Sequence, residues 1–194
     1  IEERGVGDPF RGARSVDGAP QLLSTGIHAS MENCNRNKRS VSLDLRKAKG
    51  KEIFYKLIGK ADVFYTNYGQ IRAAKLDVDY ETLSKINPRL IYANATGYGP
   101  RGPDSEERAL DPSGQARSAM MDSLGERGRP PSRMVGAPVD CMGATVGALG
   151  IMAALINRGR TGEGQMTNTS LLGSAIWLQL INIQTGLLRG GSRE

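Results

Sequence analysis

One carboxylate in the sequence stands where it could act as a nucleophile. Asp140 comes just before a run of small and apolar residues, 143–156, which predicts a buried helix whose glycines permit close packing. A carboxylate at a helix start lies among free backbone N–H groups and at the positive end of the helix dipole, so it stays ionised. Such a group can attack an electrophilic carbon without a general base, and the nearby N–H groups could hold an oxyanion.

The same position has a purely structural interpretation. An Asp at a helix start is a common N-cap, because its carboxylate accepts hydrogen bonds from the N–H groups of the first turn. Pro138, two residues earlier, helps to end whatever precedes the helix. The local sequence therefore leaves both interpretations of Asp140 open.

Composition limits the classes of protein to which the chain can belong. Its 194 residues are 39% hydrophobic, enough for one sizeable core, and its net charge of +6 favours an anionic ligand such as a nucleotide. Nucleic acid fits poorly, because the basic residues are scattered, aromatic residues make up 5%, and no nucleic-acid-binding motif is present. Cys34 and Cys141 lie far apart, which predicts neither a disulfide framework nor a metal site. We expect a cytoplasmic protein without a metal.

The uncharged run at residues 141–157 contains Thr145 and several glycines. It falls short of the roughly 18 strongly apolar residues that a membrane span needs, so a core helix is expected and no membrane contact. The chain begins at Ile1 and trails off at its other end, which favours a piece of a larger protein. We expect such a piece by itself to leave apolar helix faces uncovered.

The order of predicted elements indicates an α/β fold with an open, mostly parallel sheet and flanking helices. Residues 39–45, 62–66 and 90–95 have the pattern of strands, and helical periods at 46–58 and 76–86 separate them. This βαβ order is typical of parallel sheets, whose ligands bind at the loops after the strands. Beyond the third strand, the pattern predicts a helix at 111–124, the Asp140 helix, a strand at 166–169 and a final helix at 171–188.

Seven motifs in register resemble the class III CoA-transferases, the family of formyl-CoA transferase and carnitine CoA-transferase. The matching segments are Glu2 with 5–8, 37–45, 61–63 with 67–68, 87–91, 115–116, Asp140 and 160–165. The resemblance implies a Rossmann-like large domain, present in 1–194 as a partial chain without the family's first strand and C-terminal portion. Residues 166–194 would then lead toward the absent remainder.

The resemblance implies that Asp140 is the nucleophile. An ionised carboxylate attacks an acyl-CoA thioester to form a mixed anhydride, and the released thiolate returns to form an aspartyl-CoA thioester. The acceptor carboxylic acid then takes the CoA by the reverse steps. No histidine base is needed, and the single histidine, His28, is expected at the surface.

The resemblance also implies an interlinked homodimer and a set of contacts to coenzyme A. Lys75 and Arg108 keep the cations that family members offer to the CoA phosphates, although solvated loop charges would look the same. Glu3 replaces a CoA-contacting Arg, for which Arg4 is the expected substitute. The implied contact residues are Arg4, Leu43, Asp44, Leu45, Arg46, Asn67, Tyr68, Gly69, Lys75, Arg108 and Asp111, the last matching an acidic residue near the active site.

Departures from the family pattern bear on the choice among activities. Arg117 and Ser118 replace the usual Ser-Gly, and Ala144 replaces a glycine one turn after the nucleophile, which could alter the acyl pocket. The racemase branch of the family usually carries a Gly-His-Asp segment within the region 98–111, where this chain has no histidine. Transfer is therefore favoured over racemisation. A non-catalytic homologue that binds CoA or a partner subunit is the remaining alternative, and the retention of Asp140 argues against it.

Overall fold

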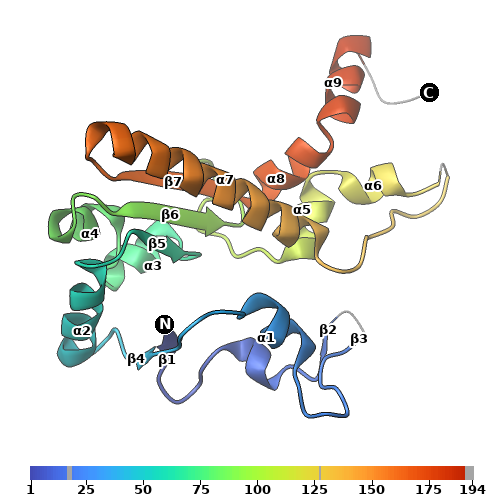
Figure 1. The fold of residues 1–194 in the computed structure, drawn as a ribbon. Helices are drawn as coiled ribbons and strands as arrows, with labels where there is room; N and C mark the ends of the chain where they lie inside the picture. Colours follow the sequence, from blue (N-terminus) through green and yellow to red (C-terminus); the bar gives the residue numbers. More distant parts are fainter. Residues whose placement is uncertain (17–18, 127, 191–194) are drawn as a thin grey trace. The chain divides into compact units, whose positions relative to one another are not determined.

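The computed structural model describes residues 1–16, 19–126 and 128–190, and it has parallel strands flanked by helices, as the sequence predicts (Figure 1). The chain divides into two compact units, Ile1–Leu57 and Ile58–Glu194, and each is described by itself. The second unit contains Asp140 and the larger sheet.

The first unit is built on a short parallel strand pair and a hairpin. Strands β1 (Glu2–Glu3) and β4 (Ser42–Leu43) pair in parallel, so the strand expected at 39–45 is only two residues long. Strands β2 (Ser15–Val16) and β3 (Ala19–Pro20) form the antiparallel hairpin. The helices are a 3-10 turn η1 (Pro9–Gly12), α1 (Ala29–Cys34) and α2 (Ala48–Ile58), whose last residue opens the second unit.

Glu2 stabilises the first loop of this unit through hydrogen bonds. Its carboxylate accepts hydrogen bonds from Arg11 Nε at 2.9 Å and Nη2 at 2.7 Å, from Ser40 Oγ at 2.6 Å and from the Asp8 backbone N–H at 3.1 Å. Arg11 and Ser40 together lower the pKa of Glu2 to about 2. The motif formed by Glu2 and residues 5–8 therefore has a structural explanation inside this unit, because it closes the loop onto a strand.

The second unit contains a parallel sheet in the order β5 (Val63–Thr66), β6 (Ile91–Thr96), β7 (Gln165–Ser170). Helices α3 (Gln70–Lys75) and α4 (Tyr80–Ile86) connect β5 to β6. Three more helices precede β7, namely α5 (Asp111–Arg117), α6 (Met120–Leu124) and α7 (Pro138–Thr161). Helices α8 (Leu171–Leu178) and α9 (Leu180–Arg189) follow β7. Helix α7 lies along β6 and β7 and packs against α8 (Figure 1).

The centre of this sheet is an aromatic core. Tyr92 of β6 is 1% exposed, and its ring lies 5.4 Å from Phe64 of β5 and 5.8 Å from Tyr80 of α4 between centroids. Neighbouring Ile91 is fully buried, as an apolar run in a strand covered on both faces requires.

Three helices differ from the sequence prediction, since one is shorter than expected and two are broken. The helix expected at 76–86 begins only at Tyr80, because Asp79 caps α4 by accepting from the Thr82 N–H. The helix expected at 111–124 divides into α5 and α6 at Ala119, whose φ is 59°. The final helix bends by 71° at Gln179, whose side chain donates to the carbonyl of Ser118 at 2.9 Å. A cap at Asp79, a left-handed residue at Ala119 and a distant hydrogen bond at Gln179 mark these positions, and periodicity reveals none of them.

The motif at residues 160–165 is also structural. Gly162 ends α7 with a φ of 83°, and its carbonyl accepts from Arg89 Nη1 at 2.7 Å. Arg158 donates to Asp62 Oδ1 at 2.8 Å and to the Arg89 carbonyl at 3.0 Å. A Cβ on Gly164 would lie 2.2 Å from the Leu90 carbonyl oxygen, so only glycine lets the chain enter β7 so close to β6. These contacts join the end of α7 to the amino ends of the strands.

We expect Gly164→Ala to destabilise the full-length protein by about 2 kcal/mol or more, because the backbone around Leu90 must shift to make room for the methyl group. Gly159→Ala is the matched control, since nothing lies within 4 Å of the position that its Cβ would take. There, a helix-interior alanine should be neutral or slightly stabilising. Chemical denaturation measures both, and equal unfolding free energies would contradict the role of Gly164.

Helix α7 is longer and less covered than the sequence predicts. Its 24 residues include an 18-residue window of mean hydropathy 1.8 that is 22% buried, so by length and composition it could cross a membrane. The bent pair α8 and α9 passes the same test, and one or two such helices are weak evidence for a membrane protein. The expectation of a run too short to span, buried as a core helix, is thus wrong. Leu149, Met152 and Ile156 of α7 are all more than half exposed.

Candidate active site

Asp140 lies at the carboxyl end of the parallel sheet. Along α7, Gly143 faces Leu171, Gly147 faces Thr169 and Gly150 faces Thr167, so the helix runs antiparallel to β7. Its first turn therefore lies where the strands end, and Asp140 is the third residue of that turn. This is the edge at which open α/β sheets bind their ligands.

The capping of α7 is provided by Asp111 and not by Asp140. The N-cap residue Ala137 has a φ of 55° and makes no side-chain capping bond. Instead, Oδ2 of Asp111, the first residue of α5, accepts from the Val139 N–H at 2.7 Å and from the Asp140 N–H at 3.0 Å. Within the described ranges, the Asp140 carboxylate itself makes no hydrogen bond or ion pair. The structure therefore argues against the capping interpretation of Asp140.

A second buried residue holds the capping carboxylate. Gln115 of α5 is fully buried and donates from Nε2 to Asp111 Oδ1 and to the Met134 carbonyl, the latter at 2.9 Å. Its Oε1 accepts from the Met134 N–H at 2.9 Å. The matching pair Gln115-Ala116 thus includes a side chain that joins α5 to the segment entering α7.

The electrostatic setting of Asp140 differs from what a helix start alone predicts. Its side chain is solvent-exposed, yet partial burial of the carboxyl group raises the pKa of Asp140, and the neighbouring Asp111 carboxylate raises it further. The helix dipole acts in the opposite direction, but a second carboxylate lies at the same helix end. At a pH above its pKa, Asp140 presents an ionised carboxylate to which no described residue donates a hydrogen bond.

Tyr65 of β5 is a nearby residue that the sequence did not identify as part of the site. A Cβ on Gly147 would lie 3.9 Å from Tyr65 Cε2, which places the ring beside α7. The side chain is about half exposed, and partial burial together with the charge of Asp140 raises the pKa of the phenol. Strand alternation was the available signal, because it places Tyr65 on the face opposite to Phe64.

The contacts predicted for CoA fall in both units. In the first unit, pairing of β1 with β4 aligns the residues that follow each strand, so Arg4 comes after one strand and Asp44, Leu45 and Arg46 come after the other. Arg46 Nε lies 2.8 Å from Asp44 Oδ1, and its Nη2 lies 3.3 Å from Glu3 Oε1. The charge of Arg46 is therefore largely balanced within the chain. Leu43 is buried.

In the second unit, residues 67–69 form the loop between β5 and α3. The guanidinium of Arg72 lies 4.3 Å from the centroid of the Tyr68 ring. Residues 100–106 approach this loop, because Glu106 accepts from the Ile71 N–H at 3.3 Å and Gln70 Nε2 donates to the Pro100 carbonyl at 3.0 Å. The structure thus brings the segments 67–71 and 100–106 together.

The two predicted cations of this unit are exposed. Lys75 is the last residue of α3, and Arg108 lies in the segment before α5. Neither makes an ion pair with any residue that the structure describes, which leaves both available to an anionic ligand.

Arg117, where the family usually has Ser, fastens the loop after β6 to α5. It forms an ion pair with Asp104, and its guanidinium lies 4.7 Å from the centroid of the Tyr98 ring. Arg117 therefore holds this loop against α5 through a charge pair and a ring contact.

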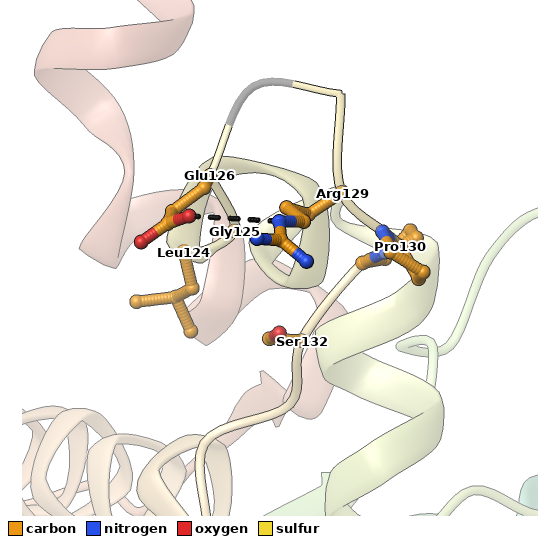
Figure 2. A pocket seen from close by; sticks show the side chains of 7 residues that line it. Leu124, Gly125, Glu126, Arg129, Pro130 and Ser132 are labelled. Atoms are coloured by element: carbon orange, nitrogen blue, oxygen red, sulfur yellow. Dashed lines mark ion pairs between the residues drawn. The ribbon is translucent and has the colours of Figure 1, made fainter.

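A separate hollow between α6 and the following loop contains none of the predicted site residues (Figure 2). Leu124, Gly125, Glu126, Arg129, Pro130, Pro131 and Ser132 line it, and Glu126 faces Arg129 across 3.8 Å in an exposed ion pair. Among the described residues, no group of three or more His, Cys, Asp or Glu side chains could hold a metal ion.

Comparison with known proteins identifies the family of this chain. Residues 1–194 match the model of CoA-transferase family III. The chain is 33% identical over 183 residues to the cinnamoyl-CoA:phenyllactate CoA-transferase of Clostridium sporogenes, covering 94% of this chain and 44% of that protein. It is 38% identical over 181 residues to the acetyl-CoA:oxalate CoA-transferase of Acetobacter aceti, covering 92% of this chain and 45% of that protein.

The fold has a solved counterpart. The crystal structure of a CAIB/BAIF family protein from Brucella suis matches 99% of this chain and 50% of its own, with a TM-score of 0.88 and 32% identity. The chain therefore belongs to CoA-transferase family III, which confirms the resemblance seen in its motifs. It spans about half the length of the relatives it matches.

Proposed function

We propose that the protein containing this chain transfers CoA from an acyl-CoA thioester to a carboxylic acid, with Asp140 as the nucleophile. The observation that carries this proposal is that Asp111 performs the capping, which leaves the Asp140 carboxylate uncommitted at the ligand-binding edge of the sheet. The names of the relatives support the reaction class, since one pairs cinnamoyl-CoA with phenyllactate and another pairs acetyl-CoA with oxalate.

The proposed chemistry proceeds through two covalent states of Asp140. An Asp140 oxygen attacks the thioester carbonyl carbon, the C–S bond breaks, and CoA leaves as the thiolate, which forms an anhydride. The thiolate then attacks the Asp140 carbonyl carbon of that anhydride, releases the donor as a carboxylate and leaves an aspartyl-CoA thioester. The acceptor carboxylate takes CoA by the same steps in reverse, so every proton remains where it was.

Mass spectrometry of the full-length protein mixed with a panel of acyl-CoA thioesters tests this proposal. A mass increase corresponding to an acyl or CoA adduct, mapped to the peptide that contains Asp140, is expected with at least one donor. That donor would also identify the acyl group. Absence of both an adduct and transfer across the panel would favour a non-catalytic CoA-binding homologue. Racemisation is the less favoured activity, because residues 98–111 contain no histidine.

We expect free CoA to bind with an affinity that falls as the salt concentration rises, because exposed cations would contact its phosphates. Lys75→Ala and Arg108→Ala should each weaken binding several-fold, since both cations lack partners among the described residues. Arg46→Ala should have a smaller effect, because Asp44 and Glu3 already balance its charge.

Calorimetry at several salt concentrations measures this binding. Lys56→Ala is a matched control, since Lys56 is exposed and pairs with Glu52 at 2.7 Å. Binding without salt dependence, or an equal loss for the control, would remove the proposed role of Lys75 and Arg108.

An interlinked homodimer is also proposed for the whole protein. It is supported by the apolar side chains that the second unit leaves exposed on its last helices, which a second copy could cover. They include Leu149, Met152, Ile156, Trp177, Ile181, Leu187 and Leu188. A cytoplasmic location stays a prediction from composition.

A further inference from the structure

Gln115 is buried, and both the nitrogen and the oxygen of its side-chain amide form hydrogen bonds. The side chain is 0% exposed, its Nε2 donates to Asp111 and to the Met134 carbonyl, and its Oε1 accepts from the Met134 N–H. Burial of an amide is costly unless such bonds form. The position therefore selects for a side chain with both donors and an acceptor.

The bonds of Gln115 hold both sides of the turn into α7. Met134 lies before the turn, whereas Asp111 bonds to Val139 and Asp140 after it. Between these points the backbone is left-handed at two consecutive residues, Gly136 with a φ of 89° and Ala137 with a φ of 55°. Such a turn persists only when its surroundings hold it, and here α5 provides the support.

We propose that Gln115 is a positioning residue that aims the Asp140 carboxylate by fixing the Asp111 side chain and the Met134 backbone. This inference rests on the proposed function, because only a nucleophilic Asp140 needs a fixed orientation toward the substrate. Gln115 itself is buried and reaches the reacting atoms only through Asp111 and the first turn of α7.

Gln115→Met in the full-length enzyme tests the proposal, because Met has a similar length but offers no donor to Asp111 or Met134. Rate constants are compared per folded molecule, with the folded fraction taken from a denaturation curve. We expect covalent adduct formation at Asp140 to slow by about 10- to 100-fold, because even a small misplacement of a nucleophile reduces the rate by this much. The dissociation constant for CoA should stay within about twofold of wild type.

Asn87→Ala is the matched control. Asn87 is another side-chain amide clamp, with Nδ2 donating to the carbonyls of Ile58 at 3.0 Å and Ala61 at 2.9 Å. It lies before β6, at the opposite end of the sheet. Its loss should lower Tm and leave the adduct rate of the folded protein unchanged. An adduct rate that falls equally in both variants would overturn the proposal, because general loosening would then explain it.

A second measurement does not depend on activity. Carbon-13 NMR titration of the Asp140 carboxyl group, assigned with Asp140→Asn, reports the pKa of Asp140 in wild type and in Gln115→Met. Among the residues that the structure describes, two titratable groups interact electrostatically with Asp140, namely Asp111 from α5 and Tyr65 from β5. Once the Asp111 carboxylate is no longer held, its repulsion weakens, and the pKa of Asp140 should move toward that of an ordinary aspartate.

The two measurements separate the proposals. If wild type forms no adduct and shows no transfer with any acyl-CoA, the proposed CoA transfer is wrong, and the NMR titration still decides whether Gln115 controls Asp140. If Gln115→Met keeps both the adduct rate and the pKa of Asp140, Gln115 serves folding alone and the positioning proposal is wrong.

Discussion

Asp140→Asn should abolish CoA transfer in the full-length enzyme while leaving CoA binding within a few-fold. The carboxylate makes a covalent bond in the proposed reaction but only weak contacts in the ground state. Asn keeps the shape and is a far poorer nucleophile, so the rate should fall by several powers of ten. Because Asp111 caps α7, neither Asp140→Asn nor Asp140→Ala should lower Tm appreciably.

Steady-state transfer, CoA calorimetry and thermal unfolding of the same preparations measure these effects. Asp122→Asn, an exposed aspartate in the first turn of α6, is the matched control and should retain activity. An Asp140→Asn enzyme that transfers CoA at the wild-type rate would exclude the covalent mechanism. A large fall in Tm would instead revive the structural role that the local sequence first allowed.

The second large effect is expected at Asp111. Asp111→Ala removes the acceptor for the Val139 and Asp140 N–H groups and leaves a donor of the buried Gln115 unpaired. Loss of a cap together with a buried unpaired donor should cost about 2–3 kcal/mol of unfolding free energy. Turnover of the folded fraction should also fall by about 100-fold, since the first turn of α7 is no longer held.

Asp111→Asn separates the charge of Asp111 from its shape. It keeps one oxygen for the start of α7, but its amide would meet the donating Nε2 of Gln115, so some stability should still be lost. Removing the charge should lower the pKa of Asp140, which Asp111 raises. Because the ionised carboxylate is the nucleophile, activity should be lost as the pH falls through the pKa of Asp140. With that pKa lowered, Asp111→Asn should keep its activity to a lower pH than wild type does.

Denaturation curves and pH–rate profiles of the full-length enzyme test both variants. The acidic limb of wild type should lie above the ordinary aspartate value of 3.8, because partial burial and Asp111 both raise the pKa of Asp140. Identical acidic limbs in wild type and Asp111→Asn would contradict the electrostatic coupling. An Asp111→Ala enzyme with wild-type stability and turnover would contradict the capping role.

Local sequence was sufficient for the three strands of the larger sheet and for the presence of the long helix. Apolar runs and strand–helix alternation predicted β5, β6 and β7, and the small apolar residues after Asp140 predicted α7. Motifs in register indicated the family, which the comparison confirmed. These features depend on neighbours a few residues apart, so periodicity reports them.

Only the tertiary structure decided which residue caps α7 and which cations are balanced. Asp111 reaches the N–H groups of Val139 and Asp140 across 28 and 29 residues, because the packing of α5 against α7 brings them together. The bend at Gln179 likewise depends on Ser118, 61 residues away. A carboxylate at a helix start looks the same in sequence whether it caps the helix or is free to react. Its role is decided by whether another acceptor already holds those N–H groups, and that depends on how distant elements pack.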